Sequence, residues 1–294
     1  EGNAGDQSDE ESGMHSMMSS FARRGGGWNV PLLALFAMVL AILTAAATPL
    51  ASAQTSSVVW DRFDVVMDVR EDGIVHVTET QVIEFDGRFR TGFVEIETAL
   101  TDDLRNIEVS MASGAGQQPE PAEETPFFTE EPGTYSVTEG RGLVEINYAY
   151  EPTSSFDSVA DNTRIIVIEY DLEGALRVYE DLDPANQQLR WIAIPGEVTE
   201  IAPIREATIT VNLPEAVDPA QTVAMPDGFD TDGQSWTWAL QNLSGGEEFE
   251  FNLQFPPITA ATVPAWQDQF DQVPEERAQA EERPAVAGTL FLGA

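Results

Sequence analysis

Few residues in this chain have the type and spacing that catalysis requires. Beyond residue 53 there is one histidine, His76, in a segment with strand-like alternation, and cysteine is absent throughout. Serine hydrolysis needs a nucleophile, a base and an orienting acid, and the sequence contains no Gly-x-Ser-x-Gly turn to present the nucleophile. We therefore expect His76 to be structural, and we expect neither a catalytic residue nor a cofactor.

Carboxylates are the most abundant reactive groups, with 51 Asp and Glu residues against 14 basic residues, all of them Arg. A glycosidase needs only two carboxylates about 5 to 10 Å apart, a condition that so acidic a chain meets by chance. The abundance of carboxylates therefore identifies no catalytic pair.

Three carboxylates alternate before Gly233 in a pattern that suggests a calcium site: Asp227, Asp230 and Asp232. An EF-hand loop with Gly233 at its sixth position would begin at Gly228, which cannot supply the first carboxylate ligand. We favour a polar turn between strands. The alternative is a weak surface calcium site, as in a calcium-dependent adhesion domain.

Two aromatic pairs and one arginine pair could contact a ligand. Trp236 and Trp238 lie two residues apart and hence on one face of a strand, as do the tyrosines at 148 and 150. Exposed, either pair could stack on a sugar, as in a carbohydrate-binding module or glycosidase; we favour the alternative that both pairs are core. Arg88 and Arg90 could bind an anion or a partner's carboxylate, although such pairs more often neutralise acids on neighbouring strands.

The segments that must position these residues alternate with a period of two, which is typical of strands. A first strand over 58–69 turns at Glu71-Asp72-Gly73 into a second, whose one face carries Val75, Val77, Glu79, Gln81 and Ile83. The pattern predicts a hairpin. Further strands are expected at 93–96, 107–111, 134–138, 143–150, 164–170, 188–194, 207–213, 222–225, 235–240 and 248–255, with a loop over 112–126.

About a dozen short strands with turn signals every ten residues or so predict an all-β, immunoglobulin-like β-sandwich over residues 54–258. Two lobes that divide near Asp183-Pro184 are an alternative, because Pro and Asn interrupt the pattern there. Residues 171–182 are open to either a helical turn or a continued strand, and Gly174 disfavours both.

The charge excludes one class of partner. At a net charge of −37 the chain repels nucleic-acid phosphates, so we expect no nucleic-acid binding. Most of this charge is expected to keep the surface solvated.

The ends of the sequence carry membrane signals. Residues 1–53 contain a polar leader, Arg23 and Arg24, an apolar core over 32–43, and Ala51-Ser52-Ala53, where we predict signal-peptide cleavage after Ala53. The competing interpretation is a retained anchor helix. Residues 259–283 are predicted to be a polar juxtamembrane linker, and 284–294 the start of a truncated transmembrane helix, since eleven residues cannot span a bilayer.

The order of several motifs resembles the YciQ-like predicted bacterial membrane proteins, a family with a domain of unknown function. The matching motifs are Asp72-Gly73 with Glu79, Gly87-Arg88-Phe89-Arg90, Leu189-Arg190-Trp191, Pro203-Ile204 before 207–214, and 243–247 leading to Phe255-Pro256. The likeness covers about Val58 to Pro257. The sequence departs from the family in the strand of Trp191, which reads Arg-Trp-Ile-Ala-Ile where the family tends toward a Tyr-Trp-Asn-like run.

The resemblance implies an exported β-rich domain followed by membrane helices, and it transfers no catalytic residue. We therefore expect a non-catalytic module at the cell membrane, on the extracytoplasmic side, held by a C-terminal helix. Its expected partners are the membrane and envelope proteins or glycans.

Overall fold

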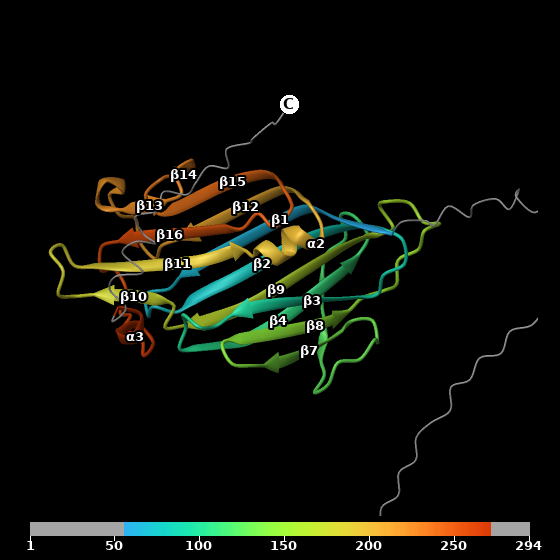
Figure 1. The fold of residues 1–294 in the computed structure, drawn as a ribbon, viewed down its shortest axis with the longest axis horizontal. Helices are drawn as coiled ribbons and strands as arrows, with labels where there is room; N and C mark the ends of the chain where they lie inside the picture. Colours follow the sequence, from blue (N-terminus) through green and yellow to red (C-terminus); the bar gives the residue numbers. More distant parts are fainter. Residues whose placement is uncertain (1–55, 272–294) are drawn as a thin grey trace, which may run out of the picture. The chain divides into compact units, whose positions relative to one another are not determined.

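The computed structural model describes residues 56–271, which belong to one compact unit of the chain (Figure 1). Sixteen strands are present among these residues, together with two short α-helices and one 3-10 turn, η1 (Pro219–Gln221). The prediction of an all-β sandwich is confirmed.

One layer is an eight-stranded sheet built around the predicted hairpin of β1 (Ser57–Val69) and β2 (Val75–Asp86). The strand order is β14-β15-β12-β1-β2-β9-β4-β5, and β1 pairs in parallel with β12 while the other pairs are antiparallel. The remaining members are β4 (Asp103–Ser113), β5 (Glu120–Pro121), β9 (Thr163–Glu173), β12 (Ile204–Asn212), β14 (Phe229–Thr231) and β15 (Ser235–Leu243).

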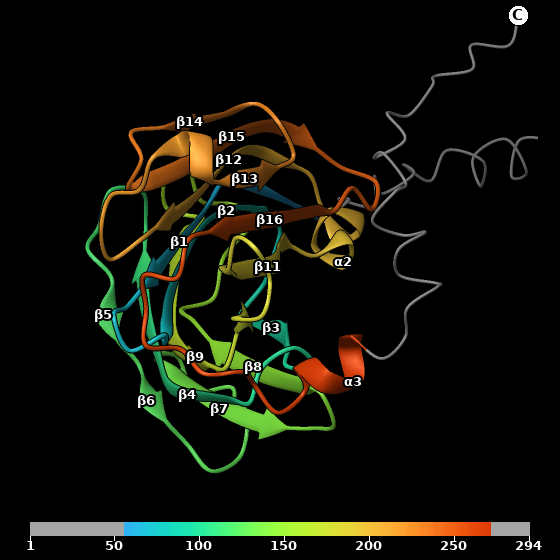
Figure 2. The same cartoon turned by 90° about the vertical axis from the view of Figure 1, so that its left-hand side faces the viewer.

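The second layer consists of two four-stranded sheets on the same side of the β1–β2 hairpin (Figure 2). One has the order β10-β11-β16-β13, and the other β3-β8-β7-β6. Their bounds are β10 (Leu176–Tyr179), β11 (Asn186–Ile194), β13 (Val223–Met225), β16 (Phe249–Phe255), β3 (Thr91–Glu97), β6 (Glu123–Glu124), β7 (Thr134–Glu139) and β8 (Leu143–Ala149). Because the second layer is divided, β3 pairs only with β8, and the part of β11 beyond Leu189 pairs only with β16.

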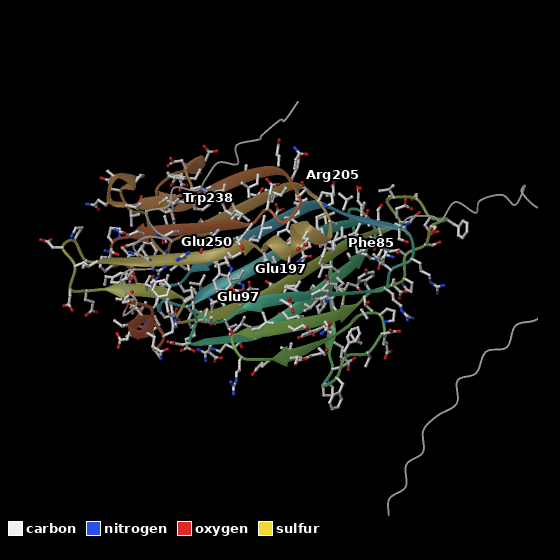
Figure 3. All side chains as sticks on the ribbon, viewed as in Figure 1. Phe85, Glu97, Glu197, Arg205, Trp238 and Glu250 are labelled. Carbon is white, nitrogen blue, oxygen red and sulfur yellow. The ribbon has the colours of Figure 1, made fainter. Side chains whose placement is uncertain are left out.

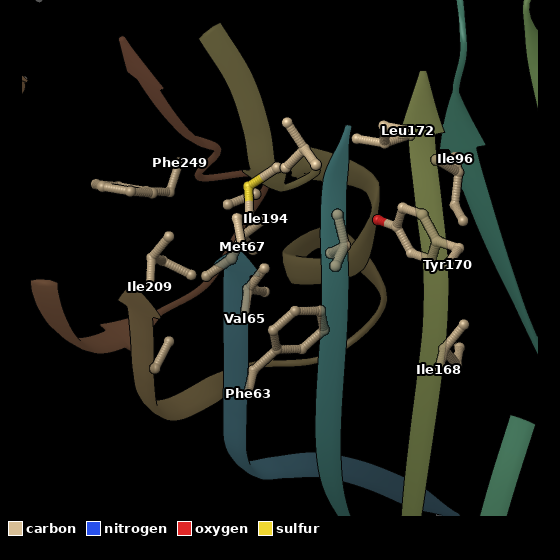
Figure 4. Packing of buried hydrophobic residues seen from close by; sticks show 14 of the residues in the cluster. Phe63, Val65, Met67, Ile96, Ile168, Tyr170, Leu172, Ile194, Ile209 and Phe249 are labelled. Atoms are coloured by element: carbon tan, nitrogen blue, oxygen red, sulfur yellow. The ribbon is translucent and has the colours of Figure 1, made fainter. Parts of the chain in front are cut away.

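The core lies between the two layers, where the inward residues of the alternating strands meet. Figure 4 shows Met67 and Ile209 of the first layer facing Ile194 and Phe249 of the second. This packing follows from the period of two, which sends every second residue of a strand to the buried face.

The structure resolves two ambiguities of the sequence. Gly174 adopts a φ of 67° between β9 and β10, so residues 171–179 continue as strand around a tight turn rather than forming a helical turn. Asp183-Pro184 lies in the connection between β10 and β11, which pair antiparallel. The eight-stranded sheet also combines strands from both sides of this break, so the two-lobe alternative is wrong.

The folded region extends past the predicted boundary at residue 258. The backbone N–H of Ala260 donates to the carbonyl of Glu71 at 2.7 Å. Further on, α3 (Gln267–Asp271) places the buried Gln267 amide against β10, where it bonds both the N–H and the C=O of Val178 at 2.9 Å. The first half of the predicted polar linker is therefore part of the domain.

The predicted membrane segments lie outside the described residues. These segments are the signal peptide with cleavage after Ala53, the remainder of the linker, and the predicted helix start at 284–294. Within residues 56–271, no helix has the length and apolar character needed to cross a bilayer.

Candidate binding groove

A cavity of about 580 Å³ opens where the two sheets of the second layer separate. One wall is β3, and the other is the segment 190–193 of β11 with the helix α2 (Gly196–Ile201) that follows it. The inward faces of β1, β2 and β9 form the floor, and in Figure 1 β2 is visible between β11 and β3. We call this cavity the β3–β11 groove.

A buried carboxyl lies in the floor of the groove. Glu79 follows Val77 on the inward face of β2, is 8% exposed, and accepts a hydrogen bond from the Tyr170 hydroxyl at 3.0 Å. Burial raises the pKa of Glu79 to about 7. Hydrogen bonds from Tyr170 and Gln81 lower the pKa and offset only part of this effect. The Gln81 side chain in turn accepts from the Trp60 indole N–H at 3.0 Å.

Tyrosines of β8 and the residue after it form part of the wall. Burial and the charges of Tyr150 and Glu79 raise the pKa of Tyr148, which keeps its phenol neutral. A side chain at Gly92 would place its Cβ 2.6 Å from the Tyr148 ring, so only glycine lets β3 approach this ring. The Tyr150 hydroxyl donates to the carbonyl of Thr91 at 3.2 Å.

The rim of the groove is strongly acidic. Of the described residues, six glutamates and one arginine line the cavity, and no Asp, His or second Arg does. Figure 3 shows Glu97 of β3 and Glu197 of α2 at the gap between β11 and β3, and Glu250 on β16 beside β11. The arginine, Arg190, is held by Glu250 through Nε–Oε1 at 2.5 Å and Nη2–Oε2 at 3.1 Å. The groove therefore presents a negative field to whatever enters it.

The rim carboxylates act on one another. Burial raises the pKa of the Glu248 carboxyl above its ordinary value. The negative charges of Glu250, Glu197 and Glu97 raise it further. A bound cation would relieve this repulsion, which is the electrostatic condition for favourable cation binding.

Helix α2 is fixed against the turn between β15 and β16, and this contact brings Glu197 to the rim. The Thr199 hydroxyl donates to the carbonyl of Glu247 at 2.7 Å, and the N–H of Gly245 donates to the carbonyl of Thr199 at 3.0 Å. A Cβ at Gly196 would lie 2.9 Å from the carbonyl oxygen of Gly246, so a larger residue would push the helix away.

Large apolar side chains are exposed at the mouth of the groove. Phe93 of β3 is 52% exposed and Ile201 of α2 is 61% exposed, and both line the cavity. Exposed apolar groups beside a concave, largely apolar floor are typical of ligand-binding surfaces.

The tryptophan pair of the sequence analysis lies elsewhere. Trp236 and Trp238 are 0% and 1% exposed on the inward face of β15, and the Trp238 indole N–H donates to the carbonyl of Pro226 at 2.8 Å. They are core residues, as favoured, and a sugar-stacking face would need exposed rings. Tyr148 and Tyr150 are each 3% exposed and are core residues too, although their edges reach the groove.

The three aspartates near Gly233 lie in and beside the predicted polar turn between β14 and β15. Asp232 accepts hydrogen bonds from the backbone N–H groups of Gln234 at 2.9 Å and Ser235 at 2.8 Å, which lower its pKa. Asp227 and Asp230 are exposed. Over residues 56–271, no group of three or more His, Asp or Glu side chains is placed to hold a metal ion.

The remaining candidates take part in ion pairs or face solvent. Arg90 pairs with Glu130 at 2.6 Å, which fits the favoured interpretation that it neutralises an acid, and Arg88 is exposed. His76 lies on β2 and its Nδ1–H donates to the Asp171 carboxylate at 2.7 Å.

Sequence reasoning missed the groove. One signal was available, because Glu79 and Gln81 are polar residues at inward positions between Val77 and Ile83. The rim glutamates come from β3, α2 and the β16 region, and no spacing in the sequence reports that these segments meet.

The fold and the groove together define an all-β sandwich domain whose divided second layer leaves a cleft. A family model described as "Predicted membrane protein (DUF2207) N-terminal domain" matches residues 60–255. The chain belongs to this family, as the resemblance predicted. A search of curated proteins finds no match.

Solved structures show only a distant likeness. A proposed protease from Parabacteroides distasonis aligns with a TM-score of 0.40 and 10% identity over 68% of this chain and 40% of its own. An M1 zinc metallopeptidase from Deinococcus radiodurans aligns with a TM-score of 0.33 and 10% identity over 67% of this chain and 42% of its own. The chain thus spans about 40% of the length of these structures, and the likeness carries no argument about activity.

Proposed function

We propose that this domain is a non-catalytic binding module of a membrane protein, placed on the extracytoplasmic side, whose β3–β11 groove binds a cationic segment of another envelope protein. The observation that carries the proposal is the composition of the groove among the described residues: a largely apolar floor that contains Glu79, and further glutamates around it, with the one lining arginine held by Glu250. Such a cleft attracts a partner that is both basic and apolar.

The surroundings of Glu79 support a binding role over a catalytic one. A carboxyl with a raised pKa is a candidate general acid, but a glycosidase pairs it with a second carboxylate at about 5 to 10 Å. The raised pKa of Glu79 has burial as its main cause and its hydroxyl partner is Tyr170 at 3.0 Å, so the shift does not depend on a paired acid.

The location rests on the sequence. Arg23 and Arg24, the apolar run over 32–43 and Ala51-Ser52-Ala53 form the pattern of an export signal. Membership of a family of predicted membrane proteins supports a membrane tether, for which the apolar segment at 284–294 is the proposed start.

A calorimetric titration of the full 294-residue chain tests the proposal. The probe is a capped eight-residue peptide of alternating Arg and Val, and its Glu–Val counterpart is the control. We expect binding of the Arg–Val peptide only. The double variant Glu95→Gln/Glu97→Gln should weaken it about fivefold, from about 0.5 kcal/mol per cross-strand charge pair.

A second variant separates the groove from the general charge of the protein. Glu206→Gln/Glu215→Gln removes two exposed carboxylates outside the cavity lining and should leave the affinity unchanged. The proposal fails if the Arg–Val peptide does not bind, or if both double variants weaken it equally.

A further inference from the structure

We infer that the β3–β11 groove takes its ligand by strand addition: an extended peptide of alternating basic and apolar residues pairs antiparallel with the open edge of β3. The inference rests on the proposed function and specifies the conformation and the sequence pattern of the ligand. Four features of the described residues carry it: the free edge, the direction of its backbone groups, the two faces of the strand, and the space beside it.

The first feature is that β3 is an edge strand that lines the cavity along its whole length. It pairs with β8 from Thr91–Ala149 to Glu97–Leu143 and with no other strand. An unpaired strand edge is a ready template for another strand, and peptide capture by sheet edges is a recurrent recognition mode.

The second feature is which backbone groups point into the groove. The backbone carbonyl of Arg90 accepts from the N–H of Tyr150 at 2.9 Å, and the backbone N–H of Thr98 donates to the carbonyl of Gly142 at 2.9 Å. The even-numbered positions of β3 therefore bond to β8. Because hydrogen bonding alternates along an antiparallel pair, the N–H and C=O groups of Phe93, Glu95 and Glu97 point to the open edge. These three residues offer up to six backbone hydrogen bonds to an added strand.

The third feature is the difference between the two faces of β3. Phe93, Glu95 and Glu97 are exposed, whereas Ile96 is buried against the core and Val94 is partly buried. In an added antiparallel strand, the residues directly opposite Glu95 and Glu97 would share their exposed face, where basic side chains form favourable cross-strand pairs. The peptide residues between these basic positions would face the groove floor over Trp60 and Tyr170. Apolar side chains at these positions would be buried there, which favours binding.

The fourth feature is the available space. A strand residue occupies roughly 160 Å³, from a rise of about 3.3 Å, a strand spacing of about 4.8 Å and a layer thickness of about 10 Å. The cavity of about 580 Å³ therefore has room for roughly four residues of an extended peptide.

Charge selects the occupant. A second copy of β3 would set Glu95 and Glu97 against the same carboxylates, and like charges directly opposite each other are destabilising. The chain's own segment 272–294 has four Glu and two Arg, so the acidic rim repels it as well. The occupant with the required chemistry is a basic segment of a different protein.

Backbone N-methylation of the Arg–Val peptide tests the pairing directly. In the antiparallel arrangement the Arg amides face β3 and the Val amides face away. We expect N-methylation of the Arg amides to weaken binding to the full chain by about tenfold, because it removes hydrogen bonds to the edge of β3. The isomeric peptide with N-methylated Val amides is the matched control, and its affinity should change by less than threefold.

Residue-resolved amide hydrogen exchange is the second measurement. Binding should slow the exchange of the Phe93, Glu95 and Glu97 amides at least tenfold, while Gly92 and Val94, whose amides already bond to β8, change little. If the peptide binds but these three amides keep their exchange rates, or the two N-methylated peptides bind alike, strand addition is refuted while the groove remains a binding site. If no basic peptide binds, the proposed function itself fails.

Discussion

Replacing the buried carboxyl of the groove, Glu79→Gln, should make the stability of the domain respond differently to pH. The pKa of Glu79 is about 7 in the folded protein, against 4.5 for the ordinary side chain. Because the folded value is the higher one, the protonated carboxyl contributes stability that is fully present below pH 4.5 and is lost as the pH rises through 7. The shift corresponds to about 3 kcal/mol at 1.36 kcal/mol per pH unit.

The wild-type chain should therefore lose roughly 2.5 kcal/mol at this site between pH 5 and pH 8.5, and the Gln variant, which does not titrate, should lose none of it. Urea unfolding followed by tryptophan fluorescence at several pH values measures the difference in unfolding free energy between the two chains. The unfolding free energy of Glu79→Gln minus that of the wild type should become more positive as the pH rises.

A control removes effects of total charge. Glu206→Gln removes one carboxyl at an exposed position outside the groove. If the free-energy difference between wild type and Glu79→Gln stays within about 0.5 kcal/mol across the pH range, or follows that of Glu206→Gln, the account of Glu79 as a buried, largely neutral carboxyl is wrong.

Three further predictions concern other groups. Trp238→Phe should cost about 1 kcal/mol more than Trp236→Phe in urea unfolding, because the Trp238 indole donates to Pro226 while the buried Trp236 Nε1 has no partner among the described residues; equal losses would contradict this. Asp171→Asn should destabilise by about 1 to 3 kcal/mol at pH 7. Its pKa is lowered because hydrogen bonds from Asn106 and His76 and the charge of Arg70 outweigh burial, so this loss should shrink as the pH falls through the folded pKa; a constant loss would refute the assignment. Binding of the Arg–Val peptide near pH 5 should release protons, because a cation lowers the raised pKa of Glu248. Calorimetry in buffers of different ionisation enthalpy measures this proton release, and proton uptake or no exchange would contradict the prediction.

The strands were predictable because the alternation of β1 and β2 is regular. Val75, Val77 and Ile83 repeat at a period of two, and a half-buried strand is what that period produces. The helix α2 was not predictable in the same way. It has six residues and is held by Thr199 against the turn before β16, which is a tertiary contact that local propensity does not report.

The site was harder to predict than the fold, because it depends on a gap between sheets. Glu97, Glu197 and Glu248 are separated by 100 and 51 positions in the chain, and each lies in an ordinary polar context. What brings them together is the division of the second layer into two sheets, and this division depends on which strand edges fail to pair. The aromatic pair at Trp236 and Trp238 had a clearer pattern in the sequence, yet the period of two marks a buried face as readily as an exposed one.

The measurement that tests the central claim most directly is the map of backbone amide shifts when the isotope-labelled full chain is titrated with the Arg–Val peptide. Residues 91–97 of β3 and 190–193 of β11 should shift most, while residues 227–234, which contain β14 and the turn that follows it, should stay unchanged. Shifts that concentrate on that turn, or that spread evenly over exposed acidic residues and spare both walls of the groove, would contradict the claim that the β3–β11 groove is the binding site.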